Sequence, residues 1–126
     1  MRAVDTNVLV RLMTRDDAGQ VTLAEAFVAH GAWVPHLAVA EATWVLDSVY
    51  DRDRDAIATA VEMLLSHERL TVQDSDVVTA AIRQYRQQPR VGFSDCLMVE
   101  VARKAGHIPL GTFDRDLGKI DGAQRL

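Results

Sequence analysis

The alternation of short apolar runs with helical patterns constrains the fold of this chain most strongly. It begins at residues 2–7, Arg-Ala-Val-Asp-Thr-Asn, where a short apolar run is broken by polar residues and helical spacing follows at once. We expect a central strand that turns into a helix here, with Asp5 at the carboxyl end of the strand. In open α/β sheets, ligands bind at that edge.

The same alternation continues to the end of the chain. Short strands are expected at residues 32–34, 70–72 and 108–112, with an edge strand at 123–126 and helical patterns between them. Gly31 and Gly106 are placed to end two of the helices. Strands separated by helices favour a parallel sheet covered on both faces. The sequence therefore predicts an α/β fold, a three-layer α/β/α sandwich with a short parallel sheet of four to five strands.

Length and composition indicate one globular domain over residues 1–126. A chain of 126 residues is long enough to bury about two thirds of the surface that its unfolded form exposes. Cys96 is the single cysteine, so no internal disulfide forms, and the composition fits a reducing cytoplasm. The N-terminal residues lack a signal-peptide pattern, and we expect no export. The longest uncharged stretch, residues 26–40, is too short to cross a bilayer, so no membrane partner is expected.

Four acidic residues are expected to meet at the carboxyl edge of the sheet: Asp5, Glu41, Asp95 and Asp114. Glu41 falls in the helical pattern of residues 36–50, in a stripe shared with Leu37 and Trp44, where burial of an unpartnered carboxylate costs several kcal/mol. Asp95 shares its helix face with apolar residues, which points it inward.

Each acid also has an ordinary structural interpretation. Asp5 is suited to capping the helix that follows it, and Asp95 to the first turn of its own helix. Glu41 has the alternatives of an ion pair with an arginine such as Arg11 and of a side chain that bends out to water. Asp114, like Asp116, has the alternative of a solvated loop acid.

Taken together, the four acids favour a metal site. Carboxylates about 5 Å apart repel by roughly 3 kcal/mol per pair at an effective dielectric constant of about 20, so the cluster requires protons or cations. An all-oxygen ligand set favours Mg²⁺ or Mn²⁺ over Zn²⁺. Such ions activate water and stabilise the charge that develops on a phosphodiester. The net charge of −4 argues against a broad basic face for nucleic acid but is compatible with a small acidic nuclease pocket.

Four motifs in the same order resemble those of the PIN-domain ribonucleases, and in particular the VapC-type toxins of toxin–antitoxin pairs. They are Ala-Val-Asp-Thr-Asn-Val-Leu-Val-Arg-Leu at 3–12, Leu-Ala-Val-Ala-Glu at 37–41 with Trp44-Val45-Leu46 after it, Phe93-Ser94-Asp95, and Gly-Thr-Phe-Asp-Arg-Asp-Leu at 111–117. The resemblance runs the whole length of the chain, and together the four motifs are quite specific.

The resemblance implies a dimeric, Mg²⁺-dependent endoribonuclease that a cognate antitoxin peptide silences near the site. It implies that Asp5, Glu41, Asp95 and Asp114 are the acidic site residues, and we expect at least Asp5, Asp95 and Asp114 to hold Mg²⁺ or Mn²⁺. The supporting polar residues are Asn7, Thr112 and Asp116.

Several arginines are weaker candidates for contacts with RNA. Arg83, Arg86 and Arg90 lie at helical spacing and form either a stripe for phosphates or, more simply, a solvated face. Arg11 and Arg15 follow the Asp5 edge, where either orienting the substrate or pairing with an acid is open.

Two other functions are consistent with the same fold. In a phosphatase or phosphoacceptor domain Asp5 itself would attack phosphorus, but residues 5–7 lack the second aspartate of the haloacid-dehalogenase pattern and no lysine occupies a phosphate-binding loop. In a non-catalytic binding module, the apolar helix at residues 36–50 would bind a partner or a second copy.

Overall fold

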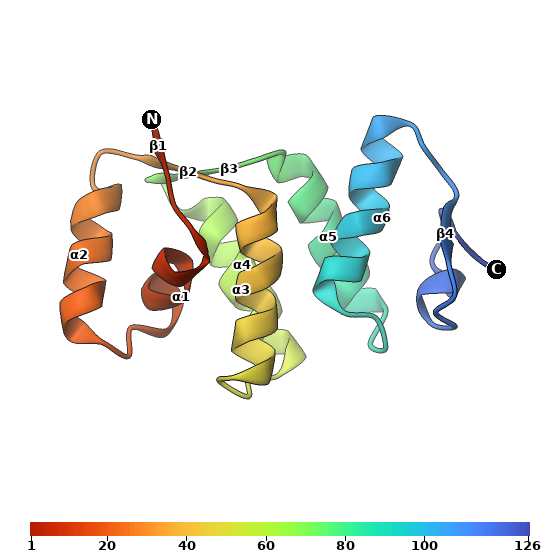
Figure 1. The fold of residues 1–126 in the computed structure, drawn as a ribbon, viewed down its shortest axis with the longest axis horizontal. Coiled ribbons are helices and arrows are strands. Elements are labelled where there is room, and N and C mark those ends of the chain that lie inside the picture. Colours follow the sequence, from red (N-terminus) through yellow and green to blue (C-terminus); the bar gives the residue numbers. More distant parts are fainter. The chain divides into compact units, whose positions relative to one another are not determined.

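The computed structural model describes all 126 residues, which form two compact units. Unit 1 comprises Met1–Ser75 and unit 2 comprises Asp76–Leu126. Each unit combines helices with a short parallel sheet (Figure 1). None of the helices has both the length and the apolar character needed to cross a membrane.

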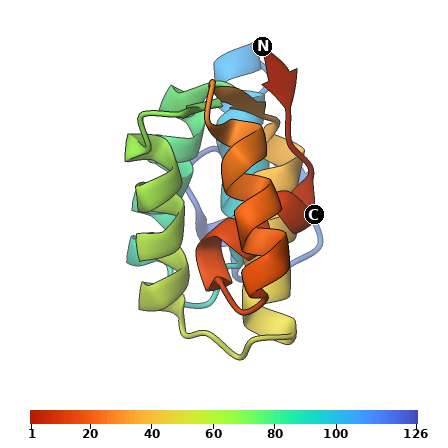
Figure 2. The same cartoon turned by 90° about the vertical axis from the view of Figure 1, so that its left-hand side faces the viewer.

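Unit 1 contains a parallel sheet of three strands and four helices. The strands are β1 (Arg2–Ala3), β2 (Ala32–Val34) and β3 (Leu70–Val72), in the order β1-β2-β3. The helices are α1 (Thr6–Thr14), α2 (Ala18–Val28), α3 (His36–Ser48) and α4 (Arg54–Ser66). Helix α1 packs against both α2 and α3, and α4 packs against α3 and β3 (Figures 1 and 2).

The core of unit 1 is built from aliphatic side chains of β2, β3 and the four helices. Leu9 of α1, Val34 of β2, Val39 of α3 and Val61 of α4 are all fully buried. Full burial of one such side chain stabilises the fold by about 1.5–3 kcal/mol. Because α1 is anchored in this core through Leu9 and Val10, Asp5 at its start has a defined position.

Unit 2 contains two long helices and a two-stranded sheet. Its elements are α5 (Ser75–Gln87), α6 (Phe93–Ala105), β4 (Leu110–Thr112), a 3₁₀ turn η1 (Leu117–Lys119) and β5 (Ala123–Arg125). Strands β4 and β5 pair in parallel. The rings of Tyr85 and Phe93 meet edge to face with centroids 6.0 Å apart, a favoured aromatic geometry.

The predicted α/β class with parallel strands is confirmed, and so are the positions of the strands and helices. Gly106 ends α6 in the left-handed conformation, with φ of 83°. The five strands form two parallel sheets of three and two strands instead of one sheet. Strand β1, expected in the centre, lies at an edge of the unit 1 sheet because only β2 pairs with it there. The single domain stays a prediction.

The predicted buried stripe of α3 is wrong. The structure buries Ala38, Val39 and Ala42 and leaves Leu37 and Trp44 each 65% exposed. Small side chains on this face allow α3 to pack close to α1, whereas the bulkier residues face outward. Glu41 therefore lies on the exposed face of its helix, and its charge is hydrated.

Candidate active site

Asp5 is the residue before α1 and caps that helix. Its Oδ1 accepts a hydrogen bond from the Val8 backbone N–H at 3.1 Å. Capping uses only one carboxylate oxygen, and the side chain is exposed. The expectation that Asp5 caps the following helix is therefore confirmed. Its second carboxylate oxygen, Oδ2, stays available to a ligand.

Glu41 reaches the start of α1 through Thr6. The Thr6 hydroxyl donates a hydrogen bond of 2.7 Å to Glu41 Oε2, which fixes the carboxylate one residue away from Asp5 along the chain. The alternative of an ion pair with Arg11 is wrong, because Arg11 donates to Asp16 and to Tyr50 at 2.9 Å each. Sequence reasoning missed Thr6, although a hydroxyl between two candidate site residues was a signal.

In unit 2, Asp95 and Asp114 form a second acidic pair. Asp95 lies in the first turn of α6 but does not cap it, since the N-cap is Gly92. Burial, and secondly the negative charge of Asp114, raise the pKa of the Asp95 carboxyl above its ordinary value. A carboxylate whose charge is disfavoured in this way gains from a nearby cation.

The loop after β4 holds Asp114 in place. Asp114 Oδ1 accepts hydrogen bonds from the backbone N–H groups of Asp116 at 2.9 Å and Leu117 at 2.8 Å. The Thr112 hydroxyl accepts one from the Asp114 N–H at 3.0 Å. Thr112 thus supports Asp114 through the backbone, in the position where a supporting residue was expected.

The other predicted site residues are exposed or engaged elsewhere. Asn7 is exposed beside Asp5. Arg15 forms an ion pair of 2.6 Å with Glu25, as Arg11 does with Asp16. The three arginines considered either for a phosphate stripe or for a solvated face are exposed: Arg83, Arg86 and Arg90. Their contacts with RNA stay predictions.

The donor set fits a hard divalent cation. The structure brings the four acids together as two pairs, Asp5 with Glu41 in unit 1 and Asp95 with Asp114 in unit 2. Neither unit by itself gathers three or more potential metal ligands. All eight carboxylate oxygens are hard ligands of the kind that Mg²⁺ and Mn²⁺ prefer. A single metal site shared by both pairs stays a prediction.

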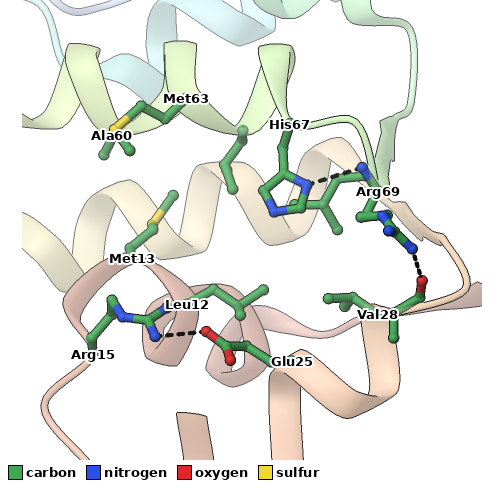
Figure 3. A pocket seen from close by; sticks show the side chains of 12 residues that line it. Leu12, Met13, Arg15, Glu25, Val28, Ala60, Met63, His67 and Arg69 are labelled. Atoms are coloured by element: carbon green, nitrogen blue, oxygen red, sulfur yellow. Dashed lines mark hydrogen bonds and ion pairs between the residues drawn. The ribbon is translucent and has the colours of Figure 1, made fainter. Parts of the chain in front are cut away.

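Two cavities open on unit 1. One of 390 Å³ is lined by Asp5 and Asn7 together with residues of α1 and α2. The other, of 530 Å³, is lined by residues of α1, α2 and α4 (Figure 3). In Figure 3, Arg15 is paired with Glu25, and His67 accepts a hydrogen bond from the backbone of Arg69. The second cavity is lined by none of the predicted acids, so only the first adjoins the candidate site.

Comparison with known proteins shows a likeness that extends over nearly the whole chain. Residues 2–123 match the PIN domain family. The chain belongs to the PIN-domain family. It is also 26% identical over 125 residues to a VapC ribonuclease of Aquifex aeolicus (strain VF5). The matched region covers 95% of this chain and 92% of the relative. No solved structure matches. One family match spans both units, so all four acids lie inside this PIN domain.

Proposed function

We propose that this PIN-domain protein is an endoribonuclease that hydrolyses RNA phosphodiester bonds with Mg²⁺ or Mn²⁺. One observation supports the proposal most strongly: within a PIN domain, none of the four acids is neutralised by an ion pair. Ion pairs of the structure involve other carboxylates, among them those of Asp16, Glu25, Glu68, Glu100 and Asp76. Four carboxylates without an ion-pair partner, three of them at strand ends or helix starts and Glu41 within α3, are suited to binding a cation.

The proposed roles follow from how each acid is held. Asp5, Asp95 and Asp114 would hold the metal, each with at least one carboxylate oxygen that has no partner in the chain. When bound, the metal supplies Lewis-acid activation of water and charge stabilisation at the phosphate. Glu41 is fixed through Oε2 by Thr6, and its other oxygen is free to take up a proton from the attacking water.

The experiment compares one acid from each unit with a matched control. Asp5→Asn and Asp95→Asn each remove one charge, whereas Asp47→Asn removes the same charge from an exposed position on α3. The proposal predicts that both site variants lose RNA cleavage and Mn²⁺ binding by calorimetry, and that the control keeps both. Full cleavage in both site variants, or cleavage that persists in EDTA, would refute the proposal.

We also propose that the protein is the toxin of a toxin–antitoxin pair and forms a homodimer. The likeness to a VapC ribonuclease along 95% of the chain supports this. A small DNA-binding protein encoded in the neighbouring reading frame should co-purify with this protein and suppress its RNA cleavage. Sedimentation of the purified chain measures the dimer, and a monomer at all concentrations would contradict that part. The phosphoacceptor alternative gains no support, because no lysine lines the groove at Asp5.

A further inference from the structure

The groove beside Asp5 has the surface of a binding site for a flat, neutral ring. It runs between α1 and α2, has a volume of 390 Å³ and is lined by Val8, Leu23 and Phe27 as well as Asp5. Pockets for small ligands occupy about 300–1,000 Å³ and have mainly apolar walls with a few polar groups. Leu23 is 72% exposed, so most of its side chain is accessible to a ligand.

Gln20 places hydrogen-bond donors in the lining of this groove. Its Oε1 accepts a hydrogen bond from Arg11 Nε, and because arginine only donates, this contact fixes which end of the amide is oxygen. The Gln20 amide nitrogen, with two N–H groups, has no partner in the chain. A ligand in the groove therefore meets donors from Gln20, and an acceptor on the ligand is favoured.

Two residues of the groove lining, Phe27 and Arg11, are held in place by contacts within the chain. Arg2 lies over the Phe27 ring, 3.9 Å from its centroid, and donates a hydrogen bond of 3.1 Å to the Phe27 carbonyl. Arg11 is anchored by Asp16 and by Tyr50 of the segment after α3. A preformed site loses less conformational entropy on binding than a flexible one.

These features favour a base over a phosphate as the ligand. The charge of Arg11 is already balanced by Asp16, and the exposed Asp5 adds a negative charge to the lining, so an anion gains nothing there. A neutral base would bury apolar surface against Leu23 and Phe27. We propose that this groove holds a nucleobase of the RNA next to the cleaved bond, and that Gln20 selects bases that carry a carbonyl oxygen.

The choice of base follows from the donors and acceptors of each ring. Guanine, uracil and cytosine have a carbonyl oxygen, which accepts from the Gln20 amide. Adenine has only ring nitrogens as acceptors, and its N1 and N7 lie beside the N6 amino group, a donor that would face the Gln20 N–H groups. Glutamine usually reads adenine with its oxygen and nitrogen together, but here Arg11 already takes one lone pair of the oxygen, which restricts the direction in which the oxygen can accept from the adenine amino group. Adenine is therefore the disfavoured base. The inference rests on the proposed ribonuclease function, because it assumes that RNA is the substrate.

The first experiment measures base preference without cleavage. Fluorescence anisotropy in EDTA gives the affinities for labelled oligouridylate and oligoadenylate, and their ratio is compared between wild type and Gln20→Ala. The loss of one hydrogen bond corresponds to a change of about fivefold to tenfold in this ratio. Gln20→Glu keeps the shape and the contact with Arg11 but replaces donors by acceptors, so the ratio should shift further towards oligoadenylate. An equal ratio in all three proteins would overturn the inference.

The second experiment tests the apolar wall with a matched pair of substitutions. Leu23→Asp and Met63→Asp add the same charge to unit 1 at exposed positions, 72% and 66% exposed respectively, but Met63 lines the other cavity (Figure 3). Only Leu23→Asp should weaken binding of oligouridylate, by about tenfold or more, and raise KM. Equal weakening by both would contradict a base in the groove.

The two proposals fail in different ways. If the ribonuclease function is wrong, wild type does not cleave RNA with Mg²⁺, whatever its base preference. If only the base groove is wrong, wild type cleaves RNA, and Gln20→Ala cleaves the same positions of a randomised RNA. If both hold, sequencing of the cut ends shows that adenine is depleted at one flanking position in wild type and is not depleted in Gln20→Ala.

Discussion

Replacement of Asp114 separates its structural role from its proposed catalytic role. The Ala variant removes the acceptor of two backbone N–H groups, at 2.9 and 2.8 Å, as well as the charge. Loss of a comparable helix cap costs about 1 kcal/mol, within a range of about 0.5–2. For a chain of this length, 1 kcal/mol lowers the melting temperature by about 3–5 °C. Asp114→Asn keeps Oδ1 as the acceptor, so it should lose less than about 0.5 kcal/mol.

Both Asp114 variants should lose RNA cleavage to a similar extent. A metal ligand is worth several kcal/mol in the transition state, and at about 1.4 kcal/mol per factor of ten the rate falls by on the order of 10²-fold or more. Thermal unfolding by circular dichroism and cleavage of a labelled RNA measure the two effects, with Asp121→Asn as an exposed control in unit 2. Wild-type cleavage by Asp114→Asn, or equal melting temperatures for the Ala and Asn variants, would refute this reasoning.

Three further predictions concern a hydrogen bond, a titration and a helix end. Thr6→Val removes the bond to Glu41 and should lower cleavage by about tenfold or more with little change in stability, whereas Thr6→Ser should restore it. Hydrogen bonds from Tyr50, and secondly from Thr14, lower the pKa of the Asp16 carboxyl. This stabilisation is present at neutral pH and is lost as the pH falls through the lowered pKa. The unfolding free energies of Asp16→Asn and wild type should therefore differ at pH 7 and converge in acid. A difference that stays constant with pH would contradict this prediction. Gly106→Ala should cost about 1 kcal/mol in urea unfolding because φ is 83°, while Gly92→Ala, with φ of −70° and open space around it, should be near neutral.

Local signals in the sequence predicted where the helices and strands lie, but they did not predict which face of a helix is buried. Gly106 predicted the end of α6, because a left-handed residue there favours glycine. The choice of face on α3 failed because Ala38, Val39 and Ala42 are as apolar as Leu37 and Trp44, and periodicity cannot rank two apolar faces of one helix.

Contacts between residues that are far apart along the chain could not be predicted from the sequence either. Arg11 was considered for substrate or for Glu41, but it binds Asp16 and Tyr50, and Tyr50 lies 39 positions further along the chain. The bond between Thr6 and Glu41 depends in the same way on how α1 packs against α3. Asp5, Asp95 and Asp114 were selected because each follows a strand or lies in the first turn of a helix, whereas Glu41 was selected from a buried stripe that the structure does not have. The role of the four acids in a common site stays a prediction.

The burial of Cys96 makes the natural chain a convenient background for labelling. Its thiol is fully buried in α6 and is the single sulfhydryl of the sequence, so a maleimide dye would react with a newly introduced surface thiol instead. In Leu23→Cys such a dye would be attached at the rim of the groove beside Asp5. Its emission would then report the arrival of an RNA base directly, with no need to remove the native cysteine.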